Sequence, residues 1–160
     1  MPALECTEWS RIIGQLASKV AVVTGASRGA GRGIALVLGE QEATVYVTGR
    51  SVQGALTSKE LPGTTIDDTS RQVTARGGVG IPARCDHTVD QSVAALFQRV
   101  RQEQGRLDIL VNNVWGGYED YDDSPFDAPF WEQPLWRWDR MFNAGVRAHY
   151  TASRIAAPLM

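Results

Sequence analysis

The hydrophobic positions of the chain fall into short β-branched runs separated by longer amphipathic segments. Val20–Val23 and Thr44–Thr48 are two such runs, and a glycine follows each of them closely. Runs of this kind are typical of buried strands in a parallel sheet. Between them, apolar residues recur at helical spacing at Ile34, Val37 and Leu38. The pattern therefore predicts a strand, a glycine turn, a helix and a second strand, which together form a βαβ unit.

The rest of the chain continues the alternation of strands and helices. The pattern predicts a loop from Ser51 to about Gly63, a short helix around Ile66–Ala75, a third strand at Val79–Ala83, a helix at Thr88–Gln104, a fourth strand at Leu107–Val111, an aperiodic loop from Val114 to about Trp131 and a final helix from near Pro134. This alternation indicates an α/β fold with a parallel sheet. We interpret the 160 residues as one domain, divided into an N-terminal extension (1–16), βαβ units (17–113), an aromatic loop (114–133) and a helix (134–160).

Two of the predicted helices carry more detailed signals. In the helix at 88–104, Thr88 and Gln91 have the spacing of a capping box, and Gly105 is placed to end the helix. An apolar stripe along this helix comprises Val89, Val93, Leu96, Phe97 and Val100. The expected buried face of the final helix comprises Leu135, Trp138, Phe142, Gly145 and Ala152. Both stripes predict helices with one face in the core.

The composition excludes several classes of function. The net charge is −2, so no strong field attracts nucleic acid or an anionic membrane. No apolar run approaches the roughly 20 residues needed to cross a bilayer, and the N-terminus, which carries Glu5 and Glu8, lacks the pattern of a secretory signal. Cys6 and Cys85 are too few and too far apart for a disulfide framework or a zinc site. We expect a cytoplasmic protein with reduced thiols and no metal.

The turn after the first strand carries the first candidate chemistry. It reads Thr24-Gly25-Ala26-Ser27-Arg28-Gly29-Ala30-Gly31. Gly25 allows a sharp turn, Gly29 allows the backbone to approach a pyrophosphate, and Gly31 allows the helix to pack closely on the sheet. The helix N-terminus then offers unpaired N–H groups to phosphates. A merely flexible turn is the alternative, but the place of the motif inside a βαβ unit favours phosphate binding. The candidate contacts are Gly25, Ser27, Arg28, Gly29, Ala30 and Gly31.

The end of the second strand favours one nicotinamide coenzyme over the other. A site for NAD usually has an acidic residue there to bind the ribose 2′-hydroxyl, and this chain has Gly49 followed by Arg50. Arg50, helped by Arg28 and Ser51, could instead bind a 2′-phosphate. A solvated loop arginine is the alternative interpretation of Arg50. The missing carboxylate predicts NADP more firmly than the arginine does, and NAD remains the less favoured coenzyme.

Three motifs together resemble the short-chain dehydrogenases/reductases, over about residues 17–160. They are the glycine motif, Cys85-Asp86-His87 after the third strand, and Asn112-Asn113 after the fourth. The resemblance implies the first half, about four strands, of a Rossmann-type doubly wound parallel sheet that binds NADP(H). It further implies that Asp86 contacts the adenine amino group, that the backbone of His87 packs beside it, and that Asn112 and Asn113 line the ribose–nicotinamide end and brace the central strands. A helix-cap role for Asp86 and a surface position for His87 are the alternatives.

The chain departs from the family's pattern at two places. Val114-Trp115 replaces the Ala-Gly that usually follows the two asparagines, and Gly145 stands where many relatives carry the Asn of the catalytic tetrad. With the sequence around residues 129–132 and 145–150, this glycine resembles the subgroup of dehydrogenase/reductase family member one. The tryptophans of the aromatic loop suggest either a lid over an apolar substrate or anchors that hold the loop against the final helix.

The resemblance implies an oxidoreductase that transfers hydride between NADP(H) and a small carbonyl or alcohol substrate, and a homo-oligomer at full length. The family's catalytic Ser and Tyr-x-x-x-Lys come after the region matched here. The four tyrosines of the chain are followed four residues later by Arg50, Asp122, Pro125 and Arg154, never by lysine. We therefore expect a fragment that does not turn over alone. A non-catalytic NADP-binding or regulatory product is the alternative function.

Overall fold

The computed structural model describes residues 14–54, 64–117 and 127–160, and contains four strands and the helices between and after them. The elements are β1 (Val20–Val23), α2 (Gly29–Glu40), β2 (Thr44–Gly49), α3 (Ile66–Ala75), β3 (Val79–Arg84), α4 (Asp90–Gln104), β4 (Ile109–Val111), the 3₁₀ turn η1 (Phe130–Glu132), α5 (Leu135–Met141), the π-helical segment η2 (Phe142–Arg147), α6 (Ala148–Ala156) and the 3₁₀ turn η3 (Ala157–Leu159). The predicted order of strands and helices is confirmed.

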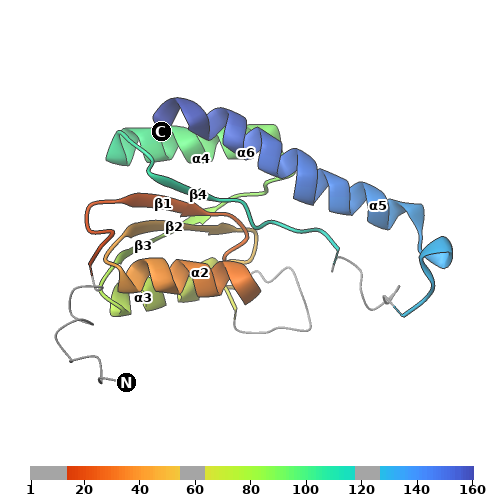
Figure 1. Cartoon of the computed structure of the whole chain (residues 1–160), viewed down its shortest axis with the longest axis horizontal. Coiled ribbons are helices and arrows are strands. Elements are labelled where there is room, and N and C mark those ends of the chain that lie inside the picture. The colour runs from red at the N-terminus through yellow and green to blue at the C-terminus, as the bar shows by residue number, and fades with distance from the viewer. Residues whose placement is uncertain (1–13, 55–63, 118–126) are drawn as a thin grey trace, which may run out of the picture.

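The four strands form one parallel sheet in the order β3-β2-β1-β4. In the register, Val22 lies beside Tyr46 of β2 on one side and beside Leu110 of β4 on the other. Helices α2 and α3 cover one face of the sheet and α4 and α6 cover the other (Figure 1). This order and layering are those of a Rossmann-type doubly wound fold, as the sequence predicted.

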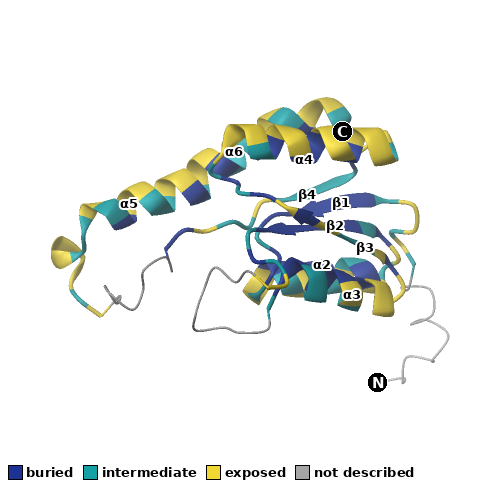
Figure 2. Cartoon of the chain, turned by 180° about the vertical axis from the view of Figure 1, so that it is seen from behind, coloured by how far each residue is buried: buried dark blue, intermediate teal, exposed yellow. Residues whose placement is uncertain are grey.

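Each face of the sheet has its own apolar core, because alternate side chains of a strand point to opposite faces. Toward α4 and α6 the core includes Val22, Tyr46 and Phe97, and toward α2 and α3 it includes Val45 and Val73. Strands buried on both sides need continuous apolar runs, which explains the β-branched segments of the sequence. Figure 2 shows the burial concentrated in the strands and in the inner faces of these helices.

The start of α4 differs from the predicted capping box. The helix begins at Asp90, its N-terminal cap residue is Val89, and no side chain caps it. The hydroxyl of Thr88 donates to the Asp86 carboxylate at 2.7 Å, so it is not available to the helix. Val89 is 44% exposed and does not belong to the buried stripe. The rest of the stripe is buried, and Gly105 ends the helix in the left-handed conformation (φ 71°), as predicted.

The predicted buried face of the final helix is wrong over its first half. Leu135, Trp138 and Phe142 are exposed, whereas Ala152 is buried as expected. The buried positions are instead Arg137, Ala144, Ala148, Ala152 and Ala156. The physical reason is visible in Figure 1: α5 extends beyond the end of the sheet, so its apolar side has no sheet to cover. Small alanines face the sheet only where α6 crosses it.

Strand β4 is shorter than predicted and lies at one edge of the described sheet. It spans three residues, and Leu107, which we expected in the strand, instead donates its N–H to the Leu159 carbonyl at 3.0 Å. Among the described residues β4 pairs only with β1. Within the same part of the chain, the structure has no helix with the length and apolar character to span a membrane.

Candidate nucleotide-binding site

The candidate site lies where the carboxyl ends of β1, β2, β3 and β4 meet. The chain winds from β1 through β2 to β3 on one side, and then returns to place β4 on the other side of β1. In open α/β sheets such a reversal leaves a crevice outside the strand ends, and ligands bind there. The three motifs singled out in the sequence follow β1, β3 and β4, so the topology brings them to this one edge.

The glycine turn has the conformation that only glycines adopt easily. Gly25 and Gly29 have positive φ angles of 66° and 56°. A Cβ at Gly25 would lie 3.2 Å from the Asn113 amide nitrogen, whereas a Cβ at Gly29 would meet nothing within 4 Å. Gly29 therefore opens onto free space at the start of α2. The N-terminal cap residue of the helix is Arg28, and no side chain accepts from the first N–H groups of α2.

Gly31 is required for close packing behind the turn. A Cβ there would overlap the Asn113 amide and would lie 2.5 Å from the Gly25 carbonyl oxygen. The Asn113 amide donates to the carbonyls of Thr24 and Gly25, each at 3.0 Å. The missing side chain at Gly31 thus leaves room for the amide that holds the turn, and the end of β4 is fastened to the end of β1.

The two asparagines act on different neighbours. The Asn112 amide donates to the Ser153 hydroxyl of α6 at 2.9 Å, and the backbone N–H of Asn113 donates to the Thr24 hydroxyl at 2.8 Å. Their side chains therefore tie β4 to α6 and to the glycine turn. Contact of either residue with the ribose–nicotinamide end of a coenzyme stays a prediction. The role of Thr24 was not predicted, although a buried hydroxyl at a strand end is a signal for such a contact.

Arg28 of the glycine turn and Arg50, which follows β2, are two arginines whose charges interact. The Arg28 guanidinium donates to the Ser51 hydroxyl at 2.8 Å, which joins the glycine turn to the residues after β2. Burial, and then the charge of Arg50, lower the pKa of Arg28 below its ordinary value. Two guanidinium groups held near each other are a site for an anion, because an anion removes their repulsion. The structure thus brings Arg28, Arg50 and Ser51 together.

Asp86 and His87 lie beside this pair, in the turn after β3. The Asp86 carboxylate accepts hydrogen bonds from the backbone and the hydroxyl of Thr88, at 3.0 and 2.7 Å. Burial acts to raise the pKa of Asp86, but these bonds, with Arg50 and His87, lower it below its ordinary value. Asp86 is therefore a carboxylate at this edge. His87 is 3% exposed and so is not the surface histidine of the alternative interpretation.

The remaining candidate residues of the turn differ in exposure. Ser27 is buried, and its carbonyl oxygen accepts from the Thr69 hydroxyl of α3 at 3.5 Å. Ala30 is exposed in the first turn of α2, next to the open position of Gly29. Ala30 is therefore accessible beside Gly29, whereas Ser27 is buried within the turn, and contact of either residue with a phosphate stays a prediction.

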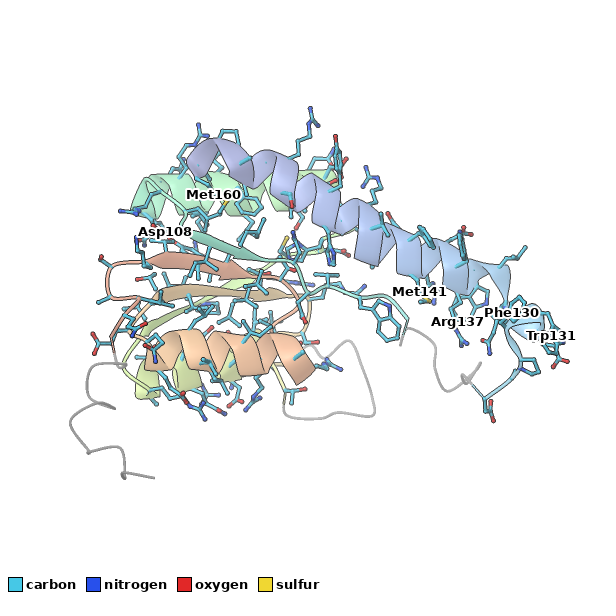
Figure 3. The ribbon with its side chains drawn as sticks, viewed as in Figure 1. Asp108, Phe130, Trp131, Arg137, Met141 and Met160 are labelled. Carbon is cyan, nitrogen blue, oxygen red and sulfur yellow. The ribbon has the colours of Figure 1, made fainter. Side chains whose placement is uncertain are left out.

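The part of the aromatic loop around Phe130 and Trp131 lies away from this edge (Figure 3). Phe130 and Trp131 are 84% and 72% exposed and contact each other edge to face, with ring centroids 5.3 Å apart. Figure 3 shows both at the outer end of α5, away from the sheet. Trp131 therefore does not anchor the loop against the helix, whereas the Trp115 ring lies near Gly145 of η2, where an added Cβ would be 3.9 Å from its Cδ1 atom. Trp115 is 45% exposed near the end of β4, and residues 118–126 lie outside the described residues.

Besides Thr24, the sequence missed two polar residues that organise the site. Thr48, fully buried in β2, bonds to His87 and to the β1 backbone. His149 of α6 lies with its Nε2 at 2.9 Å from the carbonyl oxygen of Val114, just after the two asparagines. A buried threonine in an apolar strand was a visible signal in the sequence. Nothing in the local pattern could have brought His149 to Val114.

Comparison with known proteins assigns this arrangement to a family. The sequence profile described as "short chain dehydrogenase" matches residues 19–160, which include every motif described above. The chain belongs to the short-chain dehydrogenase family. The family is one of oxidoreductases that use nicotinamide coenzymes.

Individual relatives agree with this assignment. Human "Dehydrogenase/reductase SDR family member 1" is 42% identical over 143 residues, which are 89% of this chain and 42% of that protein. A metagenomic short-chain oxidoreductase solved in complex with NADP is 33% identical, with a TM-score of 0.73 over 91% of this chain and 57% of that one. A 7α-hydroxysteroid dehydrogenase complexed with NADH and 7-oxo glycochenodeoxycholic acid is 28% identical, with a TM-score of 0.70 over 91% and 49%. The chain thus spans less than half the length of the curated relative.

Proposed function

We propose that this chain is the coenzyme-binding part of an NADP(H)-dependent oxidoreductase, which transfers hydride between NADP(H) and a carbonyl or hydroxyl group of a small substrate. The observation that carries the proposal is the pair formed by Arg28 and Arg50. Arg28 is hydrogen-bonded to Ser51, its charge interacts with that of Arg50, and Gly49 stands where an acidic residue would accept a 2′-hydroxyl. This arrangement suits the 2′-phosphate that distinguishes NADP(H) from NAD(H).

The glycine turn supports the same proposal, because its shape fits a pyrophosphate. The open side of Gly29 and the uncapped N-terminus of α2 form a cradle that any side chain at Gly29 would fill. The first turn of α2 contains no acidic residue, so no carboxylate competes with a phosphate for the N–H groups. When bound, NADP(H) would supply the hydride, and Asp86 would accept from the adenine amino group.

The finer parts of the function follow from the family resemblance. We propose that the 160 residues bind NADP(H) but do not turn a substrate over, because they contain no Tyr-x-x-x-Lys to hold and move the proton. A non-catalytic NADP-binding or regulatory product is the second candidate, favoured by the same combination of a formed coenzyme site and no such motif. NADPH oxidation by the natural protein with a carbonyl substrate would separate the two. Homo-oligomer formation and a cytoplasmic location stay predictions.

Substitution of the arginines tests the choice of coenzyme. Arg28→Ala or Arg50→Ala should weaken NADPH binding by about 10- to 100-fold, the worth of a hydrogen bond to a charged group. The affinity for NADH should change by less than about threefold, because NADH has no 2′-phosphate. Arg76→Ala is the matched control, since Arg76 pairs with Glu40 at the opposite end of the sheet. Equal losses for both coenzymes, measured by calorimetric titration, would contradict the proposal.

A further inference from the structure

His87 is a buried polar side chain at the point where three strand ends meet. Its Nε2 atom lies 2.7 Å from the hydroxyl oxygen of Thr48, which is itself fully buried in β2. The same hydroxyl lies 3.2 Å from the carbonyl oxygen of Val23, at the end of β1. One imidazole therefore connects the turn after β3 to the ends of β2 and β1.

The imidazole uses one of its two nitrogens. Its Nε2 atom is hydrogen-bonded to the Thr48 hydroxyl, which also lies within hydrogen-bond distance of the Val23 carbonyl. In either tautomer the other nitrogen, Nδ1, is a buried polar atom without a hydrogen-bond partner in the described part of the chain. A buried polar atom without a partner lowers stability, so folding alone does not explain the histidine.

The position of this bond explains what the histidine does. The Thr48 carbonyl accepts from the N–H of Ala26 in the glycine turn at 2.8 Å, and the Gly49 carbonyl accepts from the N–H of Cys85 at 3.0 Å. The next two residues along the chain are Arg50 and Ser51. The segment that carries Arg50 and Ser51 thus follows a strand end whose backbone is held on two sides and whose Thr48 side chain is bonded to His87.

We propose that His87 is a positioning residue for coenzyme choice: its bond to Thr48 holds the end of β2 so that Arg50, Ser51 and Arg28 converge on a 2′-phosphate. The inference rests on the proposed NADP(H) function and extends it to a residue that does not touch the coenzyme's phosphate. It explains why the chain keeps a buried imidazole, with one nitrogen unsatisfied, at a place where an apolar side chain would pack without that loss.

This role and a purely structural role predict opposite results for His87→Leu. Leucine has no polar nitrogen to leave unsatisfied, and the Thr48 hydroxyl keeps its bond to Val23. A positioning residue therefore predicts that the variant unfolds at the same or a higher temperature, yet binds NADPH about tenfold more weakly, the worth of about one hydrogen bond. NADH binding should change by less than about threefold. A structural residue predicts a lower unfolding temperature and parallel losses for both coenzymes.

Two further variants make the experiment specific. His87→Gln places an amide N–H near the position of Nε2, so it should restore NADPH affinity to within about threefold of the wild type. Tyr46→Phe is the matched control, because Tyr46 is also fully buried on β2 but donates its hydroxyl to Glu103 of α4 at 2.6 Å. It should lower the unfolding temperature and leave the NADPH-to-NADH affinity ratio unchanged.

The outcomes separate this inference from the function on which it rests. If the wild-type protein binds NADPH and His87→Leu leaves the affinity ratio unchanged, or if His87→Gln fails to restore it while remaining folded, the inference is wrong and the proposed function stands. If the wild-type protein binds neither coenzyme, both are overturned. The inference is supported if His87→Leu lowers the NADPH-to-NADH affinity ratio without lowering the unfolding temperature, and if His87→Gln restores the ratio.

Discussion

The buried imidazole of His87 predicts a specific loss of stability in acid. Burial lowers the pKa of His87 from its ordinary value of 6.5 to about 4, against an opposing effect of Asp86 and with a further lowering by His149. His87→Leu removes this titrating group while filling the same buried space. The pH dependence of the difference in unfolding free energy between wild type and variant therefore reports the titration of His87.

The sign and size of the effect follow from linkage. The unfolded chain takes up a proton near pH 6.5, but the folded chain resists protonation until about pH 4. The neutral imidazole therefore contributes stability above pH 6.5 that is lost as the pH falls through this window. At about 1.4 kcal/mol for each unit of pKa shift, the loss between pH 7.5 and pH 4.5 is about 2.5 kcal/mol. Paired carboxylates such as Asp108, whose pKa is about 2 because of the Val20 N–H, Arg106 and Lys19 despite some burial, titrate below this range.

Urea unfolding at the two pH values measures the effect. Between pH 7.5 and pH 4.5 the wild type should lose about 2.5 kcal/mol more than His87→Leu, with equal slopes in urea for the two proteins. Val45→Ala, which removes part of a fully buried side chain of the same sheet without removing a titrating group, serves as the control and should keep the acid loss of the wild type. Parallel pH profiles for wild type and His87→Leu would refute the reasoning, because they would mean that His87 is protonated as easily in the folded protein as in the unfolded one.

Three further substitutions, at Gly31, Asn113 and Tyr46, test contacts of the glycine turn and of β2, with Gly33→Ala and Asn112→Ala as controls. Gly31→Ala should cost more than about 2 kcal/mol in unfolding free energy, because its Cβ overlaps backbone and the Asn113 amide, whereas Gly33→Ala, with open space, should be neutral or slightly stabilising. Equal unfolding free energies for Gly31→Ala and Gly33→Ala would contradict the close contact between residue 31 and the Asn113 amide. Asn113→Ala should lower the unfolding free energy by about 1–3 kcal/mol and weaken the binding of both coenzymes. Asn112→Ala, at an exposed residue, should lower the unfolding free energy by less than about 1 kcal/mol. Equal losses in chemical unfolding would argue against the role of the Asn113 amide in holding the glycine turn. Tyr46→Phe should cost about 1 kcal/mol, checked in the same assay, and no loss would show that its bond is not maintained.

The sheet and the glycine turn could be predicted because their signals are local. A strand buried on both faces must be apolar along its whole length, as Val20–Val23 is, and a turn with positive φ at Gly25 and Gly29 needs glycine. The order of motifs along the chain then placed Asp86 and Asn113 at the same edge of the sheet. These features follow from short segments and from the rules of parallel topology.

The features that the sequence did not predict depend on tertiary contacts with residues that are distant in the sequence. Helical periodicity defined an apolar side containing Leu135 and Trp138 but could not show that α5 runs beyond the sheet. Thr88 has the spacing of a capping box, but its hydroxyl is hydrogen-bonded to the Asp86 carboxylate and does not cap the helix. The burial of His87 against Thr48 joins residues 39 positions apart, and no local pattern contains that contact.

Calorimetric titration of the wild-type protein with NADPH and with NADH tests the central claim most directly. The account predicts saturable binding of one coenzyme molecule per chain, with NADPH bound at least about tenfold more tightly than NADH because Arg28 and Arg50 act on the 2′-phosphate. Equal or tighter binding of NADH would contradict the proposed coenzyme, and no binding of either would contradict the nucleotide site itself.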